Sequence, residues 1–304
     1  MTEKQHGGAA GAHRPMDSRR LSELRARVLR RGTQALYEDA ALFDQLYRRR
    51  RQDVRFYVQI ARRYGGPVLE LGCGSGRVAF ELAQAGIEVL GIDTMPSMLQ
   101  RARERSARLP QAARARVSFR RGDMRRLKLG RTFRLVIAPF NAFTHLYTRR
   151  DLERALAGCR DHLAARGRLV FDVPMPDLRA LAQDPERLYA CGSLLDARDG
   201  QRYRQYEASH YDPVEQIRSV TFVFERADRP REQRALPLTQ RQFFPAELEA
   251  LLFYNGFAIE RRYGDFAGGA LEPHSESQVV VARPSTGRSA RAAARPGYAG
   301  RARA

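Results

Sequence analysis

Several features that mark other classes of protein are scarce in this chain of 304 residues. Only three cysteines occur, Cys73, Cys159 and Cys191, and they lie too far apart in the sequence for a metal-binding motif or a disulfide framework. No apolar run approaches the roughly 20 residues of a membrane span, and the polar N-terminus lacks the apolar core of a signal peptide. The composition therefore predicts a cytoplasmic protein with no metal site and no membrane partner.

Lysine is almost absent, since only Lys4 and Lys128 occur among the 54 basic residues. The formal net charge is nevertheless +20. Residues 1–35 hold eight basic and three acidic residues, and residues 284–304 hold five arginines and no acid, so half of the excess charge lies near the two ends. Because no basic stripe with interleaved aromatic residues accompanies this charge, a nucleic-acid partner is not expected, although the charge alone leaves one open.

The most informative stretch is residues 68–77, in which a short apolar strand runs directly into three alternating glycines, Gly72, Gly74 and Gly76. Glycine suits a sharp turn at which a ligand approaches the backbone closely. A dinucleotide loop has the spacing G-x-G-x-x-G, and its third glycine would fall at Arg77. The observed G-x-G-x-G spacing, which follows Glu70 by two residues, favours a different ligand.

Three further candidate positions stand at the ends of predicted strands. Asp93 ends a strand 17 residues after Gly76, near the place where nucleotide-binding α/β folds carry an acid for the ribose hydroxyls. Asp123 follows a predicted strand over residues 117–120. A strand over residues 133–137 runs into residues 138–143, which include Pro139.

In this order, over residues 68–145, the four motifs resemble those of the class I methyltransferases that use S-adenosylmethionine (SAM), and a looser likeness extends over residues 37–283. The resemblance implies that Glu70 binds the ammonium of SAM, that Asp93 binds its ribose and that Asp123 binds its adenine. It also implies that residues 139–141 face the methionine and the methyl group. The expected cofactor-binding residues are Glu70, Gly72, Cys73, Gly74, Gly76, Asp93, Thr94, Met95, Asp123, Met124, Pro139, Phe140 and Asn141.

Alternating strands and helices predict an α/β fold with a doubly wound, Rossmann-like parallel sheet. Asp172, near the end of a predicted strand over residues 168–173, is expected either to have a structural role or to support the residues that contact the ligand. Period-two alternation predicts an inserted antiparallel sheet of three strands, over residues 203–211, 217–227 and 234–243. Residues 257–263 and 278–282 resemble the family's antiparallel final strand pair.

The expected domain plan has three parts. Residues 1–35 form a flexible basic extension, residues 36–283 form the methyltransferase domain, and residues 284–304 form a disordered basic tail. Within the domain, the resemblance implies lid helices over residues 36–66, and residues 187–243 carry the inserted sheet.

His145 and Tyr47 are the candidate catalytic residues. His145 lies four residues after Asn141, and a histidine can take a proton near neutral pH. The layout resembles that of aminosugar N-methyltransferases, in which a histidine and a lid-helix tyrosine at the matching positions line the acceptor site. A packing role is an equally open interpretation for both residues.

Together these features predict an enzyme that transfers the methyl group of SAM to a nitrogen or oxygen of a small molecule. An RNA or protein acceptor is the alternative, which only the basic charge favours. A nucleotide-dependent oxidoreductase or a SAM-binding module without catalysis would belong to another class. Arg77 argues against the oxidoreductase, and no sequence feature decides against the binding module. The oligomeric state, including a homodimer, is left open.

Overall fold

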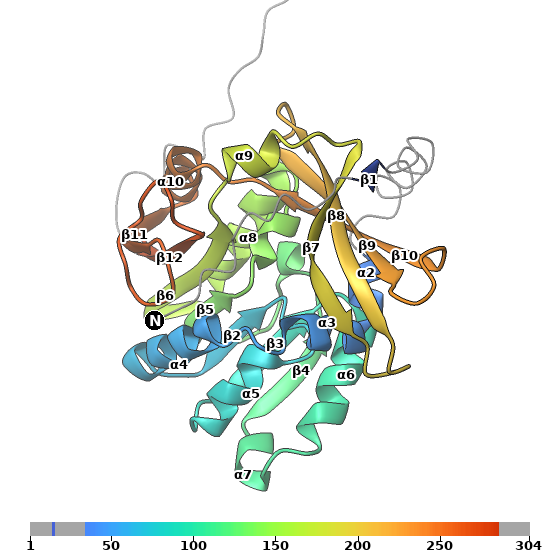
Figure 1. Ribbon diagram of the computed structural model, residues 1–304. Helices are drawn as coiled ribbons and strands as arrows, with labels where there is room; N and C mark the ends of the chain where they lie inside the picture. Colours follow the sequence, from blue (N-terminus) through green and yellow to red (C-terminus); the bar gives the residue numbers. More distant parts are fainter. Residues whose placement is uncertain (1–13, 16–33, 286–304) are drawn as a thin grey trace, which may run out of the picture. The chain divides into compact units, whose positions relative to one another are not determined.

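The computed structural model describes residues 14–15 and 34–285 of the chain (Figure 1). The expected basic extension over residues 1–35 and the expected basic tail over residues 284–304 therefore lie almost wholly outside the described residues. The chain divides into two compact units. Unit 1 comprises Met1–Arg50 and Pro176–Gln242, and unit 2 comprises Arg51–Met175 and Phe243–Ala304. In the described part, no helix is both long and apolar enough to cross a membrane.

Unit 2 is built on a seven-stranded sheet with the order β11-β12-β6-β5-β2-β3-β4. The parallel strands are β2 (Val68–Leu71), β3 (Val89–Asp93), β4 (Val117–Arg121), β5 (Phe133–Ala138) and β6 (Leu163–Pro174). The antiparallel pair β11 (Phe257–Tyr263) and β12 (Ser277–Pro284) completes it, with β12 antiparallel to β6. The predicted fold class is thus confirmed. Strand order reverses between β2 and β5, where α/β sheets bind ligands at the carboxyl ends of their strands.

Helices cover both faces of this sheet (Figure 1). They are α4 (Gln52–Tyr64), α5 (Arg77–Gln84), α6 (Pro96–Ser106), α7 (Gln111–Arg114), α8 (Arg149–Asp161) and α10 (Pro245–Tyr254), together with the short 3₁₀ helices η1 (Met124–Arg126) and η2 (Ala142–His145). Val68 of β2 belongs to the core formed with α4 and α5, whereas Leu69 belongs to the core formed with α8 and α10. Strand β2 is therefore buried on both faces.

Unit 1 contains an antiparallel sheet with the order β1-β7-β8-β9-β10. Its strands are β1 (Arg14–Pro15), β7 (Arg187–Leu195), β8 (Arg202–Asp212), β9 (Ile217–Arg226) and β10 (Gln233–Arg241), and its helices are α2 (Gln34–Glu38), α3 (Ala40–Tyr47) and α9 (Leu178–Leu181). The three predicted inserted strands correspond to β8, β9 and β10. Strand β7 was not predicted, because most of its side chains are exposed and an irregularity between Ala190 and Gly192 breaks its alternation.

The helices that were expected together over residues 36–66 fall into both units. Helices α2 and α3 belong to unit 1, where Leu36 and Leu42 pack against Val220, Phe224 and Leu238 of the sheet. Helix α4 belongs to unit 2 and packs against its sheet. A lid function for these helices stays a prediction.

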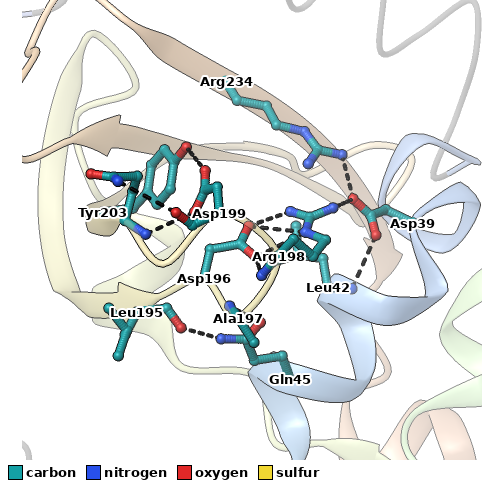
Figure 2. Close-up of polar contacts among 11 residues, drawn as sticks. Asp39, Leu42, Gln45, Leu195, Asp196, Ala197, Arg198, Asp199, Tyr203 and Arg234 are labelled. Carbon is teal, nitrogen blue, oxygen red and sulfur yellow. Dashed lines mark hydrogen bonds and ion pairs between the residues drawn. The ribbon is translucent and has the colours of Figure 1, made fainter.

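Asp39 joins α3 to the strands of unit 1 (Figure 2). Its carboxylate caps α3 by accepting the N–H of Leu42 at 3.0 Å, and it pairs with Arg198 at 2.5 Å and Arg234 at 2.9 Å. Arg198 lies in the turn between β7 and β8 and also pairs with Asp196. Burial raises the pKa of Asp39, but the bonds from Leu42, Arg234 and Arg198 outweigh it and leave the pKa below its ordinary value.

Asp39→Ala should lower the free energy of unfolding by about 1 to 3 kcal/mol, because it removes a helix cap and the shared partner of two arginines. Since the pKa of Asp39 is lowered, its contribution is present above pH 3.8 and is lost as the pH falls below that value. Urea unfolding at pH 7 and pH 3 measures both effects. The matched control is Glu38→Ala, which alters an exposed neighbour. Equal losses in the two variants would contradict the prediction.

Candidate functional site

The three glycines lie between β2 and α5, at the carboxyl end of the central strand. Gly72 and Gly76 have φ values of 70° and 85°, in the left-handed region that favours glycine. A Cβ on Gly76 would lie 2.7 Å from the ring of Phe80, and one on Gly72 would lie 3.0 Å from the Cβ of Ala142. A Cβ on Gly74 would meet only a methionine sulfur at 4.0 Å. Gly74 is thus the position at which the loop leaves room beside its backbone.

Four N–H groups of this loop donate to acceptors inside the protein. Those of Gly72 and Cys73 donate to the carbonyl of Ile92 at 2.8 and 3.0 Å, and that of Gly76 donates to Cys73 at 2.9 Å. The N–H of Gly74 donates to Asp93 Oδ2 at 2.8 Å. A phosphate site needs free N–H groups that point at the anion. These four N–H groups are committed elsewhere, so the loop is poorly suited to a dinucleotide and the expectation of a ligand without phosphate is supported.

Cys73 contributes packing rather than a polar side chain. It is buried, and a Cβ on Gly91 of β3 would lie 2.9 Å from its Sγ. Burial raises the pKa of the Cys73 thiol well above its ordinary value. The thiol is therefore protonated and inert at neutral pH.

Glu70 of β2 is 2% exposed and lies at the base of the glycine loop. Its Oε2 is buried and has no hydrogen-bond partner among the described residues. Burial raises the pKa of Glu70 to about 8; Arg77 opposes this rise, and Asp93 adds to it. A buried carboxyl group with an unused oxygen fits an ammonium group, such as that of SAM, because the cation would supply both a hydrogen bond and the missing charge.

Asp93 ends β3 and ties the glycine loop to the start of α6. Oδ2 accepts the N–H of Gly74 and Oδ1 accepts the N–H of Met95 at 2.9 Å. Burial raises the pKa of Asp93, and the bonds from Met95 and Gly74 partly offset that rise. Each carboxylate oxygen retains a further lone pair that could accept a ribose hydroxyl. Thr94, between Asp93 and Met95, is exposed.

Asp123 and Met124 follow β4, the next strand of the sheet. Asp123 caps η1 through the N–H of Arg125 and pairs with the Arg125 guanidinium at 2.7 Å. This bond to Arg125 lowers the pKa of Asp123 below its ordinary value. The Asp123 side chain stays partly exposed. The Met124 side chain reaches the glycine loop, where its Cε lies 3.9 Å from the position of a Cβ on Gly72.

The loop after β5 begins at the buried Pro139, and both Phe140 and Asn141 have positive φ values, 56° and 63°. Residues held in this region cost on the order of 1 to 3 kcal/mol each, less for asparagine than for phenylalanine. Asp172 of β6 accepts their N–H groups at 2.8 and 3.0 Å. Asp172 therefore holds the backbone of this loop in place. Tyr57 of α4 donates its hydroxyl to Asp172 Oδ1 at 2.6 Å.

Sequence reasoning missed an ion pair beside this loop. Arg77, the first residue of α5, donates to both carboxylate oxygens of Asp53 of α4 at 2.9 and 2.6 Å, and Asp53 is fully buried. The Arg77 guanidinium also lies over the Phe140 ring, 5.0 Å from its centroid. In the sequence, Arg77 is informative only because it stands where a dinucleotide loop has its third glycine. The one signal in the sequence was an acidic residue at the start of an otherwise amphipathic helix.

The two candidate catalytic residues lie in different units. His145 is the half-buried last residue of η2, directly after the loop at residues 139–141. Tyr47 is the last residue of α3, where its ring lies 4.8 Å from that of Phe43. Burial raises the pKa of Tyr47, so its hydroxyl is protonated at neutral pH. A shared acceptor site of His145 and Tyr47 stays a prediction.

The described residues therefore gather most of the expected cofactor-binding residues at the carboxyl ends of adjacent strands β5, β2, β3 and β4. They offer an acid for an ammonium, an acid for a ribose and an acid near the place expected for adenine. This donor and acceptor set fits SAM, with Glu70, Asp93 and Asp123 as the residues that would hold it.

Comparison with known proteins gives consistent results. Residues 68–167 match the family model of a methyltransferase domain. The chain is 26% identical over 229 residues to the putative methyltransferase YqeM of Bacillus subtilis, covering 70% of this chain and 81% of YqeM. It is 30% identical over 105 residues to dTDP-3-amino-3,4,6-trideoxy-alpha-D-glucopyranose N,N-dimethyltransferase of Streptomyces venezuelae, covering 34% of this chain and 41% of that enzyme. The structure of the CcbJ methyltransferase from Streptomyces caelestis matches with a TM-score of 0.67 at 27% identity, covering 77% of this chain and 90% of CcbJ.

Glu70→Gln should change both ligand binding and the pH dependence of stability. Between pH 4.5 and about 8 the folded chain holds a proton on Glu70 that the unfolded chain has lost, so the ligand-free protein loses stability as the pH rises. Glutamine cannot ionise, and the variant should gain about 2 to 4 kcal/mol relative to wild type between pH 5 and pH 8. It should also bind SAM at least about 10-fold more weakly, because the ammonium loses a charged partner.

Denaturant unfolding at both pH values and calorimetry with SAM measure these two effects. Glu88→Gln, at an exposed glutamate, is the matched control. Parallel pH profiles for wild type and Glu70→Gln, or an unchanged SAM affinity, would show that Glu70 does not have this role.

Proposed function

We propose that this chain, which carries a domain of the class I SAM-dependent methyltransferase family, transfers the methyl group of SAM to a nitrogen, or to an oxygen, of a small-molecule acceptor. The assignment of SAM as the methyl donor rests on the buried Glu70 carboxyl group, whose Oε2 has no hydrogen-bond partner among the described residues. It lies beside a loop whose three glycines already donate their N–H groups to acceptors inside the protein. The acceptor half rests on the 30% identical relative, which is named as an aminosugar N,N-dimethyltransferase.

Bound SAM supplies an electrophilic methyl group on a sulfonium. The chain's own residues then have to bind, orient and exclude water, because methyl transfer is an in-line displacement with little acid–base chemistry of its own. Glu70 and Asp93 would hold the two ends of the donor, and the loop at residues 139–141 would limit the space beside the reacting carbon. The strained backbone of that loop supports such a placement, since strain tends to gather at functional sites.

On the acceptor side, a proton has to leave when the acceptor is an ammonium or a hydroxyl group. His145 ends η2, the 3₁₀ helix that follows the strained loop, and the side chain of a histidine can accept such a proton. Tyr47 would contribute a protonated hydroxyl to the acceptor site. A nitrogen acceptor is favoured over oxygen by the aminosugar relative. A cytoplasmic location stays a prediction from the sequence, and the oligomeric state, including a homodimer, stays open.

A turnover screen tests this proposal directly. The purified full chain is incubated with SAM and with matched panels of small amines, including aminosugars, and of phenols, carboxylates and RNA, and each product is identified by mass. We expect S-adenosylhomocysteine formation that depends on the amine panel, with one or two added methyl groups in the product. Turnover only with RNA would overturn the small-molecule acceptor. NAD binding without SAM binding would overturn the donor assignment.

A polyanionic acceptor is the second candidate, for one specific reason. Residues 101–134 hold thirteen basic and two acidic residues, a formal charge of +11, and they span α6, α7, the edge strand β4 and η1. Arg114, Arg120 and Arg126 in this stretch are exposed. If nucleic acid binds there as an acceptor, RNA turnover should fall steeply with salt. Turnover of a small amine should change little over the same range.

Removing the proposed base should slow proton removal. If His145 takes a proton from the acceptor, His145→Ala should lower kcat by at least about 100-fold while the affinity for SAM is unchanged, since a general base contributes about 10² to 10⁴. His145→Gln should be nearly as slow, because glutamine keeps a hydrogen bond but cannot take the proton. The exposed His274→Ala is the matched control, and steady-state kinetics with the identified acceptor measures all three variants.

Positioning by His145 predicts a different pattern. In that case His145→Gln recovers most of the activity, and His145→Ala mainly raises the KM of the acceptor. Wild-type turnover in both variants would make His145 a packing residue.

A further inference from the structure

The loop after β5 adopts a backbone that its own residues do not favour. Two consecutive residues other than glycine, Phe140 and Asn141, have left-handed φ values. Asparagine tolerates this region, whereas a bulky residue such as phenylalanine is a genuine outlier there. Such a conformation persists only where surrounding contacts over-determine it. The described residues supply those contacts from two sides.

The first set of contacts acts on the backbone. The two oxygens of Asp172 accept the successive N–H groups of Phe140 and Asn141, at 2.8 and 3.0 Å. Asp172 is fully buried, so these charge-assisted bonds are not weakened by water. Tyr57, also fully buried, donates its hydroxyl to Oδ1 of Asp172 at 2.6 Å. Tyr57 therefore orients the carboxylate that in turn orients the loop.

The second set of contacts acts on the ring of Phe140. The guanidinium of Arg77 lies over this ring, and both of its terminal nitrogens are held by the buried carboxylate of Asp53. A planar guanidinium can make a bidentate bond to a carboxylate and stack on an aromatic face at the same time. Arg77 is also the first residue after the last glycine of the loop.

Both sets of contacts originate from one face of α4. Asp53 and Tyr57 are four residues apart, so their side chains lie on the same side of the helix. Asp53 reaches the glycine-loop helix through Arg77, and Tyr57 reaches β6 through Asp172. The glycine loop also touches the β5 loop directly, since a Cβ on Gly72 would lie 3.0 Å from the Cβ of Ala142.

We propose that the pairs Asp53–Arg77 and Tyr57–Asp172 are positioning residues for methyl transfer, because they hold Phe140 and Asn141 in the left-handed conformation beside the donor loop. This inference rests on the proposed function, which makes residues 139–141 the loop that faces the transferred methyl group. None of the four residues needs to touch SAM or the acceptor. Their effect is on the geometry of the reacting centre, where small displacements are costly in rate.

The first experiment needs no acceptor. Backbone amide hydrogen exchange of Phe140 and Asn141 is followed in the full chain for wild type, Tyr57→Phe and Tyr64→Phe. Tyr57→Phe removes only the hydroxyl that bonds Asp172, and Tyr64→Phe removes a hydroxyl from the same helix away from this contact. We expect exchange at residues 140 and 141 to be about 10-fold faster in Tyr57→Phe, since a hydrogen bond to a charged group is lost. Tyr64→Phe should match wild type.

The second experiment measures the consequence for catalysis. With the acceptor that the wild type methylates, Tyr57→Phe should lower kcat about 10-fold, while the affinity for SAM changes less than about threefold because Glu70 and Asp93 are untouched. Arg77→Lys keeps a charge for Asp53 but loses the planar stacking on Phe140. It should likewise lower kcat about 10-fold while the affinity for SAM changes less than about threefold. Arg62→Lys, at an exposed position of α4, is its control.

A double-mutant cycle separates positioning from general destabilisation. Asn141→Gly removes the part of the left-handed backbone's cost that falls on residue 141, because glycine adopts positive φ readily. In the Asn141→Gly background, Tyr57→Phe should therefore lower kcat less than about threefold. A variant that only weakens the fold would cost the same factor in both backgrounds.

The outcomes distinguish this inference from the proposed function. Unchanged exchange at residues 140 and 141 in Tyr57→Phe, or equal kcat losses in the two backgrounds, would overturn the positioning role. Wild-type turnover of a hydroxyl acceptor or of RNA in place of an amine would change the acceptor assignment alone, and the same variants are then compared with that acceptor. Should the wild type turn over no acceptor, the function fails, and the exchange measurement still decides whether the loop is held as described.

Discussion

In unit 2, the buried acids Asp53, Glu70 and Asp172 all interact with one guanidinium, that of Arg77. The electrostatics of the site follow from this excess of buried carboxyl groups over positive charge. Burial lowers the pKa of Arg77, but Asp53, Glu70 and Asp172 together raise it above its ordinary value. Arg77 donates its bidentate hydrogen bonds to Asp53. Burial of Glu70, which the charge of Arg77 offsets only in part, then raises its pKa and favours the protonated state. A ligand that brings an ammonium and a sulfonium supplies the charge that the protein lacks, which a dinucleotide with its phosphates cannot do.

The buried Glu70 carboxyl group and the left-handed loop lower the stability of the ligand-free protein, and a bound ligand can relieve these costs. A carboxyl group that is buried and only partly hydrogen-bonded costs free energy in either protonation state, as a neutral group with an unused oxygen or as an unpaired charge. The left-handed loop adds a second local cost of about 1 to 3 kcal/mol per residue. Both costs fall at the carboxyl ends of β2 and β5, beside the strand-order reversal, whereas the other residues of these two strands are apolar and buried apart from the exposed Arg134. The fold thus concentrates its unfavourable features where a ligand can relieve them.

The sequence predicts the parts of the site that are local. The glycines, Glu70, Asp93 and Asp123 each belong to a strand and the turn that follows it, so spacing alone places them at one edge of a parallel sheet. The contacts that hold Phe140, which are the pairs Asp53–Arg77 and Tyr57–Asp172, could not be predicted in this way. Tyr57 and Asp172 are 115 residues apart and Arg77 and Asp53 are 24 apart, and nothing in either neighbourhood specifies the pairing. Strand β7 was missed for a related reason, because an exposed strand carries no alternation from which to predict it.

The residues expected to bind SAM and the elements expected to contact the acceptor fall largely into different units. Every residue expected to bind SAM lies in unit 2, whereas Tyr47 and the inserted sheet lie in unit 1. A core that binds one donor can be kept while the unit that carries the inserted sheet varies, because the donor residues depend on backbone geometry within their own unit. The pairs Asp53–Arg77 and Tyr57–Asp172, which start from α4, belong to unit 2 as well. If they position the methyl-facing loop, their effect on rate should be the same for every acceptor of this enzyme, whereas substitutions at Tyr47 should change the ranking of acceptors. On this proposal, unit 2 sets the geometry of methyl transfer and Tyr47 of unit 1 contributes to the choice of acceptor.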